Sequence, residues 1–294
     1  MKGIVGYWVF RALFGFLGLL PESVIRRLGL GIGYLMSFVA RRRFTMTERH
    51  QRRVLGPDAD VRKAARRVFA LYGRYWAETF WIRPRRHEDA LRRSTLGGLE
   101  HLHRAVASGR GVILALGHTG NWEIAGLRAA TEGARVLAVA ETLSNPRIVE
   151  WWVQMREMMD IDVVLTGKGI RATGDLIRRL ESGGTIALLS DRDLKGTGIP
   201  VTLFGEETTL PAGPLSLACR TGAVLLPTGT YFMPGAGHHF EVYPPLDIPQ
   251  EGELEERVRE GTLRFARVLE QIIRKHPQQW HLIIPNWPSD QDYW

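Results

Sequence analysis

The residues best suited to acid–base chemistry are His118 and Glu123, in the sequence HTGNWE. On one continuous helix, residues at this spacing lie roughly 140° apart, so their side chains would point away from each other. They can meet only if His118 lies in a turn and Glu123 begins the next helix, a bend that Gly117 and Gly120 allow. The carboxylate would then fix the imidazole tautomer and leave the other ring nitrogen as a general base. The alternative is a histidine hydrogen-bonded within a loop, with Glu123 placed by its preference for a helix N-terminus.

The segments around this pair predict an α/β fold. Residues 111–126 form an apolar run, a glycine-containing turn and the start of a helical pattern near Trp122, which indicates a strand–turn–helix unit. The same patterns predict strands at 112–116, 136–140, 163–165, 186–189, 224–232 and 240–243. They predict helices at 61–81, 99–108, 146–159, 171–181, 211–220 and 253–275. This alternation is typical of a mixed, largely parallel central sheet flanked by helices.

The N-terminal part of the chain is apolar but interrupted by charges. Its longest uncharged runs, at 12–21 and 28–40, have 10 and 13 residues. A membrane-spanning helix needs roughly 20. We therefore expect residues 1–90 to form an apolar helical extension that lies in the membrane interface, packed on an α/β domain at 91–294 as one structural unit. The alternative is that both apolar segments are core helices.

Positive charge is concentrated just after this apolar segment. Between Arg41 and Arg93 there are 16 Lys and Arg against 6 Asp and Glu, whereas the net charge of the whole chain is +8. Such a surplus favours an anionic partner, either membrane headgroups or nucleic-acid phosphates. The sequence contains no recognised nucleic-acid-binding module, and three consecutive arginines at 41–43 follow the apolar segment directly. We therefore expect an anionic membrane lipid as a partner, and no nucleic acid.

Other kinds of catalytic site find little support in the sequence. The single cysteine, Cys219, excludes an intrachain disulfide and a cysteine-rich zinc site. The histidine pairs His101/His103 and His238/His239 have no evident third ligand, so no metal or other cofactor is expected. The G-x-S-x-G turn of many serine hydrolases is absent from the sequence. General-base chemistry at His118 is the best-supported alternative.

The HTGNWE segment resembles the H-x₄-D/E motif of the lysophospholipid acyltransferase superfamily. It is most similar to the bacterial branch that contains the late acyltransferases of lipid A and the phosphatidylinositol mannoside acyltransferases. Further segments follow the order of that branch: IALLSDRD at 186–193, PVTLFG at 200–205, PAGP at 211–214, LACRTGA at 217–223 and WH at 280–281. Within the branch, the DRD, LFG and PAGP segments look most like the mannoside acyltransferases of actinobacteria.

This resemblance implies transfer of a fatty acyl group from acyl-CoA, with palmitoyl-CoA the expected donor, to a hydroxyl of a phosphatidylinositol mannoside. The alternatives are lipid A acylation from an acyl carrier protein and a non-catalytic membrane-binding relative. His118 would be the general base and Glu123 would orient it, while backbone N–H groups at 117–121 would hold the oxyanion. The implied location is the cytoplasmic face of the bacterial inner membrane, peripheral or monotopic. The oligomeric state is left open.

The resemblance also implies further site residues. By motif order Asp191 matches a second carboxylate of the branch, and Arg156 and Arg220 match two arginines that suit the phosphates of coenzyme A. Surface or helix-capping roles are the alternatives for these arginines. The remaining expected substrate-binding residues are Asn121, Trp122, Glu141 and Arg192. The Trp and Met residues at 151, 152, 155, 158 and 159 either line an acyl-chain groove or pack in the core.

Overall fold

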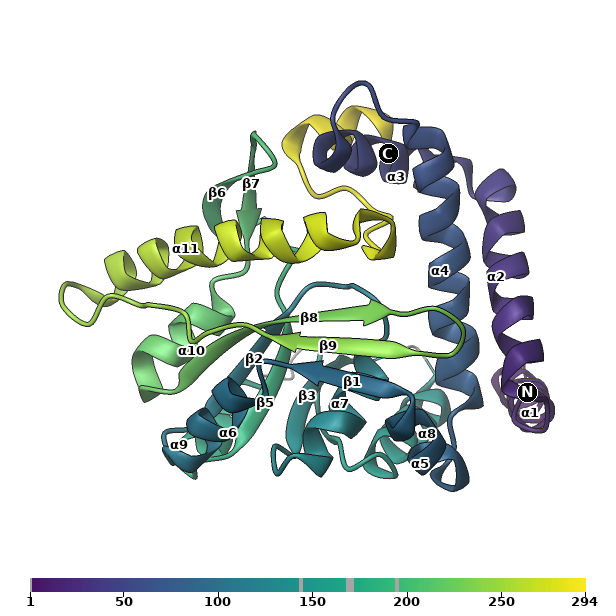
Figure 1. The fold of residues 1–294 in the computed structure, drawn as a ribbon, viewed down its shortest axis with the longest axis horizontal. Helices are drawn as coiled ribbons and strands as arrows, with labels where there is room; N and C mark the ends of the chain where they lie inside the picture. Colours follow the sequence, from purple (N-terminus) through teal and green to yellow (C-terminus); the bar gives the residue numbers. More distant parts are fainter. Residues whose placement is uncertain (1, 143–144, 168–171, 194–195) are drawn as a thin grey trace.

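A seven-stranded sheet lies at the centre of the computed structural model, which describes residues 2–142, 145–167, 172–193 and 196–294 (Figure 1). The strands follow the order β1–β9–β8–β2–β5–β3–β4. Their bounds are Ser94–Gly97 (β1), Val112–Leu116 (β2), Val136–Glu141 (β3), Asp162–Thr166 (β4), Thr185–Leu189 (β5), Val224–Phe232 (β8) and His238–Val242 (β9). Neighbouring strands are parallel except for β8 with β9. The mixed α/β class with a largely parallel sheet is therefore confirmed.

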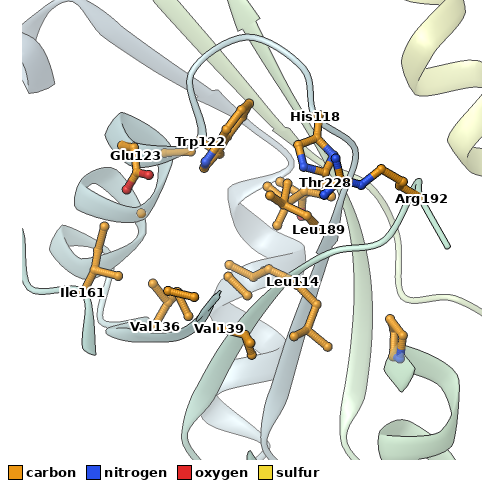
Figure 2. Close-up of a pocket in the computed structure, with 18 of the residues that line it drawn as sticks. Leu114, His118, Trp122, Glu123, Val136, Val139, Ile161, Leu189, Arg192 and Thr228 are labelled. Carbon is orange, nitrogen blue, oxygen red and sulfur yellow. The ribbon is translucent and has the colours of Figure 1, made fainter. Parts of the chain in front are cut away.

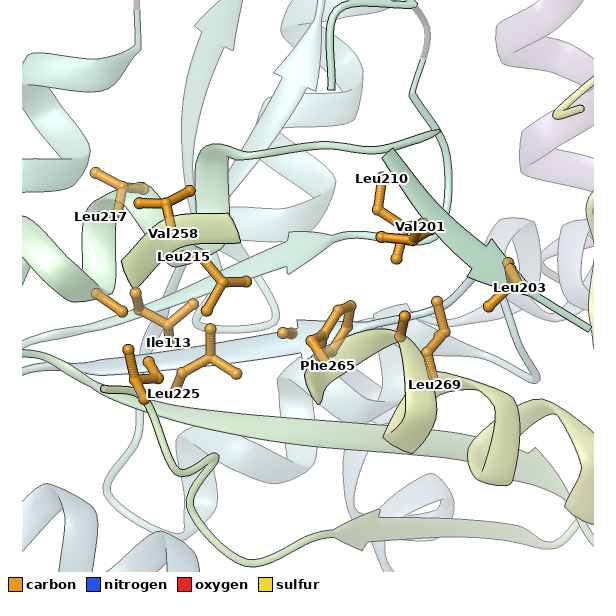
Figure 3. Packing of buried hydrophobic residues seen from close by; sticks show 14 of the residues in the cluster. Ile113, Val201, Leu203, Leu210, Leu215, Leu217, Leu225, Val258, Phe265 and Leu269 are labelled. Carbon is orange, nitrogen blue, oxygen red and sulfur yellow. The ribbon is translucent and has the colours of Figure 1, made fainter. Parts of the chain in front are cut away.

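Helices cover both faces of the sheet because its central strands alternate apolar side chains between the two sides. One face carries α6 (Leu99–Ala107), α7 (Trp122–Thr131) and α8 (Pro146–Glu157), and the other carries α9 (Thr173–Glu181), α10 (Gly213–Thr221) and α11 (Leu254–Lys275). Within β2, Val112 and Leu114 pack with the helices on the first face, and Ile113 packs with those on the second. Figure 3 shows residues packed on the second face, among them Phe265 of α11 and Ile113 of β2. Both β2 and β8 are buried along their whole length, as is typical of strands covered on two sides.

The strands and helices predicted from periodicity all correspond to elements of the structure, with ends that differ by a few residues. The predicted helix start at 171 lies outside the described residues, and the described helix begins at Thr173. Two features of the strands were not predicted. One is the short edge strand β1, and the other is a hairpin of β6 (Ile199–Leu203) and β7 (Glu206–Leu210). The hairpin turn is Phe204–Gly205. Both residues have positive φ, as a two-residue turn of type I′ requires.

Four helices precede the sheet: α1 (Lys2–Leu17), α2 (Glu22–Val39), α3 (Arg41–Leu55) and α4 (Val61–Trp81), followed by the short α5 (Pro84–Arg92). Helices α2 and α4 lie side by side (Figure 1), in close contact through glycines. A Cβ atom on Gly33 would lie 2.2 Å from the Phe69 carbonyl oxygen, and one on Gly73 would lie 2.1 Å from that of Gly29. Glycine is therefore needed for the two backbones to approach this closely.

The outer surface of α2 is apolar and exposed. The side chains of Ile32, Leu35 and Phe38 are 59%, 63% and 50% exposed, respectively. No helix among the described residues is by itself long and apolar enough to cross a membrane. Only α2 and α3 taken together meet such a criterion, and they are bent by 101° relative to each other.

Candidate active site

The turn between β2 and α7 carries His118, and Glu123 lies in the first turn of α7, as predicted. Asn121 caps the helix, since its side-chain Oδ1 accepts hydrogen bonds from the backbone N–H groups of Glu123 (3.2 Å) and Ile124 (3.3 Å). Gly120 has φ 52°, and a Cβ there would lie 2.4 Å from the carbonyl oxygen of Thr230. Only glycine fits this point of the turn, which brings His118 to the carboxyl edge of the sheet.

The imidazole of His118 is bonded to Asp191. The Asp191 Oδ1 lies 2.6 Å from His118 Nδ1, and its Oδ2 accepts the backbone N–H of His118 at 2.9 Å. Trp280 donates its indole N–H to the same Oδ2 at 2.7 Å. Burial alone would raise the pKa of Asp191, but the contacts with His118 and Trp280 outweigh it and lower that pKa to about 2. The ionised carboxylate favours a proton on Nδ1, which leaves Nε2 as the basic nitrogen.

The prediction that Glu123 orients His118 is wrong, because the Glu123 carboxylate is bound by Arg156. The Arg156 Nε and NH2 atoms donate to its two oxygens at 2.9 and 2.6 Å. The Tyr75 hydroxyl donates to the same carboxylate at 3.4 Å. Figure 2 shows Trp122 between Glu123 and His118. The rings of His118 and Trp122 meet edge-on, with their centroids 5.4 Å apart. Asp191, rather than Glu123, binds the His118 imidazole. It follows β5, and β5 is a parallel neighbour of β2, so both residues lie at the same edge of the sheet.

The Glu123–Arg156 pair is buried and electrostatically coupled. Burial would lower the pKa of the Arg156 guanidinium, but the Glu123 carboxylate outweighs this effect and raises it. Burial, followed by the negative charge of Glu123, raises the pKa of the Tyr75 hydroxyl, so that hydroxyl remains a donor. Because Arg156 is balanced by Glu123, it is not a free cation for a substrate phosphate. This corrects the phosphate-binding role expected for Arg156.

A cavity of about 1040 Å³ opens beside this pair. Its interior is apolar, with Leu114, Val136, Val139 and Ile161 drawn in Figure 2. The predicted site residues on its wall are His118, Trp122, Glu123, Glu141, Arg156, Arg192 and Arg220. Its size is at the upper end of the range typical of ligand pockets, about 300–1,000 Å³. The cavity therefore combines a general base with an apolar interior.

Two of the predicted arginines, Arg192 and Arg220, add positive charge to the cavity wall. Arg192 directly follows Asp191, and Figure 2 shows its side chain extending toward His118. Arg220 lies exposed near the end of α10, and Glu141 lies exposed at the end of β3. Within the described part of the chain, neither Arg192 nor Arg220 has a carboxylate partner. Both are therefore available for an anionic group.

Three of the five backbone N–H groups at 117–121, where the oxyanion site was predicted, already have acceptors within the protein. The N–H of His118 is bonded to Asp191 Oδ2 at 2.9 Å, that of Thr119 to the Gly117 carbonyl at 2.8 Å, and that of Gly120 to the Gln279 carbonyl at 3.2 Å. Asp191 and the C-terminal segment therefore accept the hydrogen bonds of two backbone N–H groups of the turn, those of His118 and Gly120.

The buried Glu78 of α4 pairs with Arg74 of the same helix and contacts the turn between β2 and α7. The Glu78 carboxylate accepts from Arg74 Nε at 2.6 Å and from Asn121 Nδ2 at 3.2 Å. His238 Nε2 lies 3.4 Å from the same carboxylate. Both ends of the Asn121 amide are thus engaged by protein groups, and Asn121 is not part of the cavity wall. The structure does not support the predicted contact between Asn121 and substrate.

The C-terminal segment completes the site, and the sequence pattern did not assign it a role. His281 donates its backbone N–H to the His118 carbonyl at 2.7 Å, and its Nε2 lies 3.1 Å from the Gly120 carbonyl. Burial lowers the pKa of His281 to about 3, so its ring is neutral and positions the turn. Only the order of the WH segment relative to the other motifs pointed to this contact.

The Trp and Met residues in α8 and just after it divide between the two predicted environments. Trp151, Met155 and Met159 are buried in the core, and Trp152 lies on the wall of the cavity. Cys219 is partly buried in α10 beside the other hydrophobic core cluster. The predicted helical stripe is therefore mainly a packing surface.

Comparison with known proteins gives the family to which this site belongs. Residues 1–289 match the family model described as bacterial lipid A biosynthesis acyltransferase. A phosphatidylinositol mannoside acyltransferase of Mycobacterium tuberculosis is 34% identical over 280 residues, which cover 89% of this chain and 86% of that protein. The enzyme of the same name from Mycolicibacterium smegmatis is 36% identical over 245 residues, covering 82% and 79%. A lipid A biosynthesis acyltransferase of Haemophilus influenzae is 25% identical over 207 residues, covering 69% and 61%.

Proposed function

Since this chain belongs to the bacterial lipid A biosynthesis acyltransferase family and is an acyltransferase, we propose that it transfers a fatty acyl group from acyl-CoA to a hydroxyl of a phosphatidylinositol mannoside. The names of the mycobacterial relatives support this acceptor. The observation that carries the chemistry is the 2.6 Å contact between His118 Nδ1 and Asp191 at the wall of an apolar cavity.

In the proposed mechanism His118 Nε2 removes the proton from the acceptor hydroxyl while the hydroxyl oxygen attacks the thioester carbonyl carbon. The tetrahedral intermediate then collapses, the carbon–sulfur bond breaks, and the coenzyme A sulfur leaves with the proton from the imidazolium. Asp191 stabilises that imidazolium and keeps the ring in its working orientation. General-base assistance of this kind contributes about 10²- to 10⁴-fold in rate. The activated thioester makes an acyl-enzyme unnecessary.

The donor fits the two parts of the cavity. Palmitoyl-CoA has an apolar chain, which suits the interior around Leu114, Val136 and Ile161. Its phosphates suit Arg192 and Arg220, which lie on the cavity wall without carboxylate partners among the described residues. Arg220→Gln should therefore raise KM for palmitoyl-CoA but leave KM unchanged for S-palmitoyl-N-acetylcysteamine, a thioester without phosphates.

The proposed location is the cytoplasmic face of the bacterial inner membrane, where the protein is peripheral or monotopic. The exposed apolar side chains of α2 and the arginines at 41–43 that follow them support this location. A glycolipid acceptor would then reach the site from the membrane surface.

The decisive test is transfer of labelled palmitate by the purified protein to a panel of acceptors. The panel contains phosphatidylinositol mannosides, lipid A precursors and lysophospholipids, each assayed with palmitoyl-CoA and with palmitoyl-acyl carrier protein. We expect transfer to the mannosides from palmitoyl-CoA and its loss in His118→Ala. Transfer only to lipid A precursors, only to lysophospholipids or only to water would overturn the proposed acceptor.

A further inference from the structure

A second, smaller cavity of about 260 Å³ lies where α1, the start of α5 and α8 meet. Its wall consists of two arginines and otherwise apolar groups: Arg11, Phe14, Gly15, Arg83, Trp151, Met155 and Met158. None of these residues lines the cavity that contains His118. The proposed acyl transfer makes no use of this space.

Positive charge is concentrated at this cavity, on Arg11 and Arg83 of its wall and on the neighbouring Arg85 and Arg86. The guanidinium of Arg83 lies 3.5 Å from the centre of the Phe14 ring and donates to the Phe14 carbonyl at 2.9 Å. Arg85 and Arg86 both donate to the Gly18 carbonyl, at 3.0 and 2.8 Å. Burial, followed by the positive charges of Arg86, Arg85 and Arg11, lowers the pKa of Arg83 to about 10. The positive charges of Arg11, Arg85 and Arg86 therefore repel that of Arg83.

No carboxylate among the described residues forms an ion pair with Arg11, Arg83, Arg85 or Arg86. The Asp89 carboxylate acts on Arg86 electrostatically, but it is already paired with Arg92 and Arg93. The Arg83, Arg85 and Arg86 side chains donate to uncharged carbonyl groups near the end of α1, which does not balance their charge. An anion placed here would relieve the repulsion.

The remaining residues of the cavity wall are mostly apolar. Trp151 and Met155 are buried, whereas Met158 is 50% exposed at the rim. Phe16 and Leu19, which follow the cavity residue Gly15 in the sequence, are 59% and 71% exposed. Methionine side chains adapt to irregular apolar ligands. The cavity thus places an apolar slot beside an unbalanced positive charge.

We propose that this cavity binds one anionic phospholipid that is neither the donor nor the acceptor of the reaction. Its phosphate would contact Arg11 and Arg83, and one acyl chain would lie against Trp151, Met155 and Met158. The lipid would join α1 to α8, the helix that carries Arg156. The site is independent of the proposed acceptor, since it requires only a phosphate ester attached to an acyl chain.

Two variants test the two halves of the site. Arg11→Gln removes a charge from an exposed side chain, and Arg27→Gln on α2 is its matched control. Gly15→Phe fills the slot, because a Cβ at Gly15 meets no atom within 4 Å. Gly31→Phe is its control, since Gly31 on α2 is equally open.

Native mass spectrometry of the full chain measures binding of dioctanoyl phosphatidylglycerol, dioctanoyl phosphatidylcholine and inorganic phosphate. We expect tighter binding of phosphatidylglycerol than of the other two. Arg11→Gln and Gly15→Phe should each weaken that binding about tenfold, with the controls within about twofold of the unmodified protein. Equal binding of inorganic phosphate would reduce the site to an anion site and overturn the proposal. Binding that is insensitive to both variants, or equally affected by both controls, would also overturn it. Thermal unfolding of each variant shows whether the fold is intact.

Discussion

Asp191 holds both the ring and the backbone of His118: one carboxylate oxygen lies 2.6 Å from Nδ1 and the other accepts the His118 N–H at 2.9 Å. The two residues lie 73 positions apart and meet because β2 and β5 are parallel neighbours. The carboxyl ends of parallel strands share one edge of a sheet, which is where α/β proteins usually place their sites. A single carboxylate therefore fixes the tautomer, the ring orientation and the turn.

The first prediction concerns this carboxylate. Asp191→Asn should lower kcat for palmitoyl transfer about 10²- to 10⁴-fold, because a neutral amide cannot stabilise the imidazolium. Steady-state kinetics with labelled palmitoyl-CoA measure the effect. Asp162→Asn, which removes a partly exposed carboxylate paired with Arg135, is the control and should leave kcat unchanged. Full activity in Asp191→Asn would contradict the assigned role.

The second prediction concerns the buried pair of Glu123 and Arg156. Arg156→Leu should cost about 3–5 kcal/mol in the free energy of unfolding, because it leaves a buried carboxylate without its partner. The double variant Glu123→Gln with Arg156→Leu should recover part of that loss. Urea denaturation measures both. Arg135→Gln removes an exposed ion-pairing side chain and should cost much less than Arg156→Leu. Equal losses for the buried and exposed pairs would refute the argument.

The third prediction is that the protein loses stability in mild acid. Burial lowers the pKa of His50 to about 4 and the pKa values of His238 and His281 to about 3, from an ordinary value of 6.5. Between roughly pH 6 and pH 5 the unfolded chain binds a proton at most of these sites and the folded protein binds almost none. The free energy of unfolding should therefore fall with falling pH, by up to about 1.4 kcal/mol per pH unit for each histidine.

Urea unfolding at a series of pH values measures this slope. His50→Gln removes one of the three groups and should reduce the slope by about 1.4 kcal/mol per pH unit. His103→Gln, which replaces a histidine whose side chain is 52% exposed, is the surface control for the substitution itself. An identical slope in His50→Gln and the unmodified protein would show that another group controls acid unfolding.

The fourth prediction concerns the outer surface of α2. Replacing Ile32 and Leu35 by Ser should weaken binding to phosphatidylglycerol vesicles by at least about tenfold, because each buried side chain of this size contributes about 1.5–3 kcal/mol. Vesicle sedimentation measures the change. Leu254→Ser, at the start of α11, replaces another exposed apolar side chain and should have no effect. Retention on duplex DNA but not on vesicles at the same salt concentration would favour the nucleic-acid alternative.

Local patterns predicted much of the fold because they report local geometry. Helical periodicity located α4 at its observed bounds, and apolar runs located the central strands. The β6–β7 hairpin was not predicted because its strands carry polar side chains and Pro200. Its turn, Phe204–Gly205, also lacks the residue types typical of such turns at its first position. The edge strand β1 escaped because four residues are too few to show a period.

The sequence alone determined that His118 lies in a turn, that Glu123 begins a helix and that general-base chemistry is available, since residue types and short spacings suffice for these points. The order of the motifs also brought Asp191 into consideration. The tertiary structure alone decided that Asp191 binds His118, that Arg156 binds Glu123 and that the C-terminal segment uses the N–H group of Gly120. These contacts join segments far apart in the chain, and they depend on which strands and helices become neighbours, which no local periodicity records.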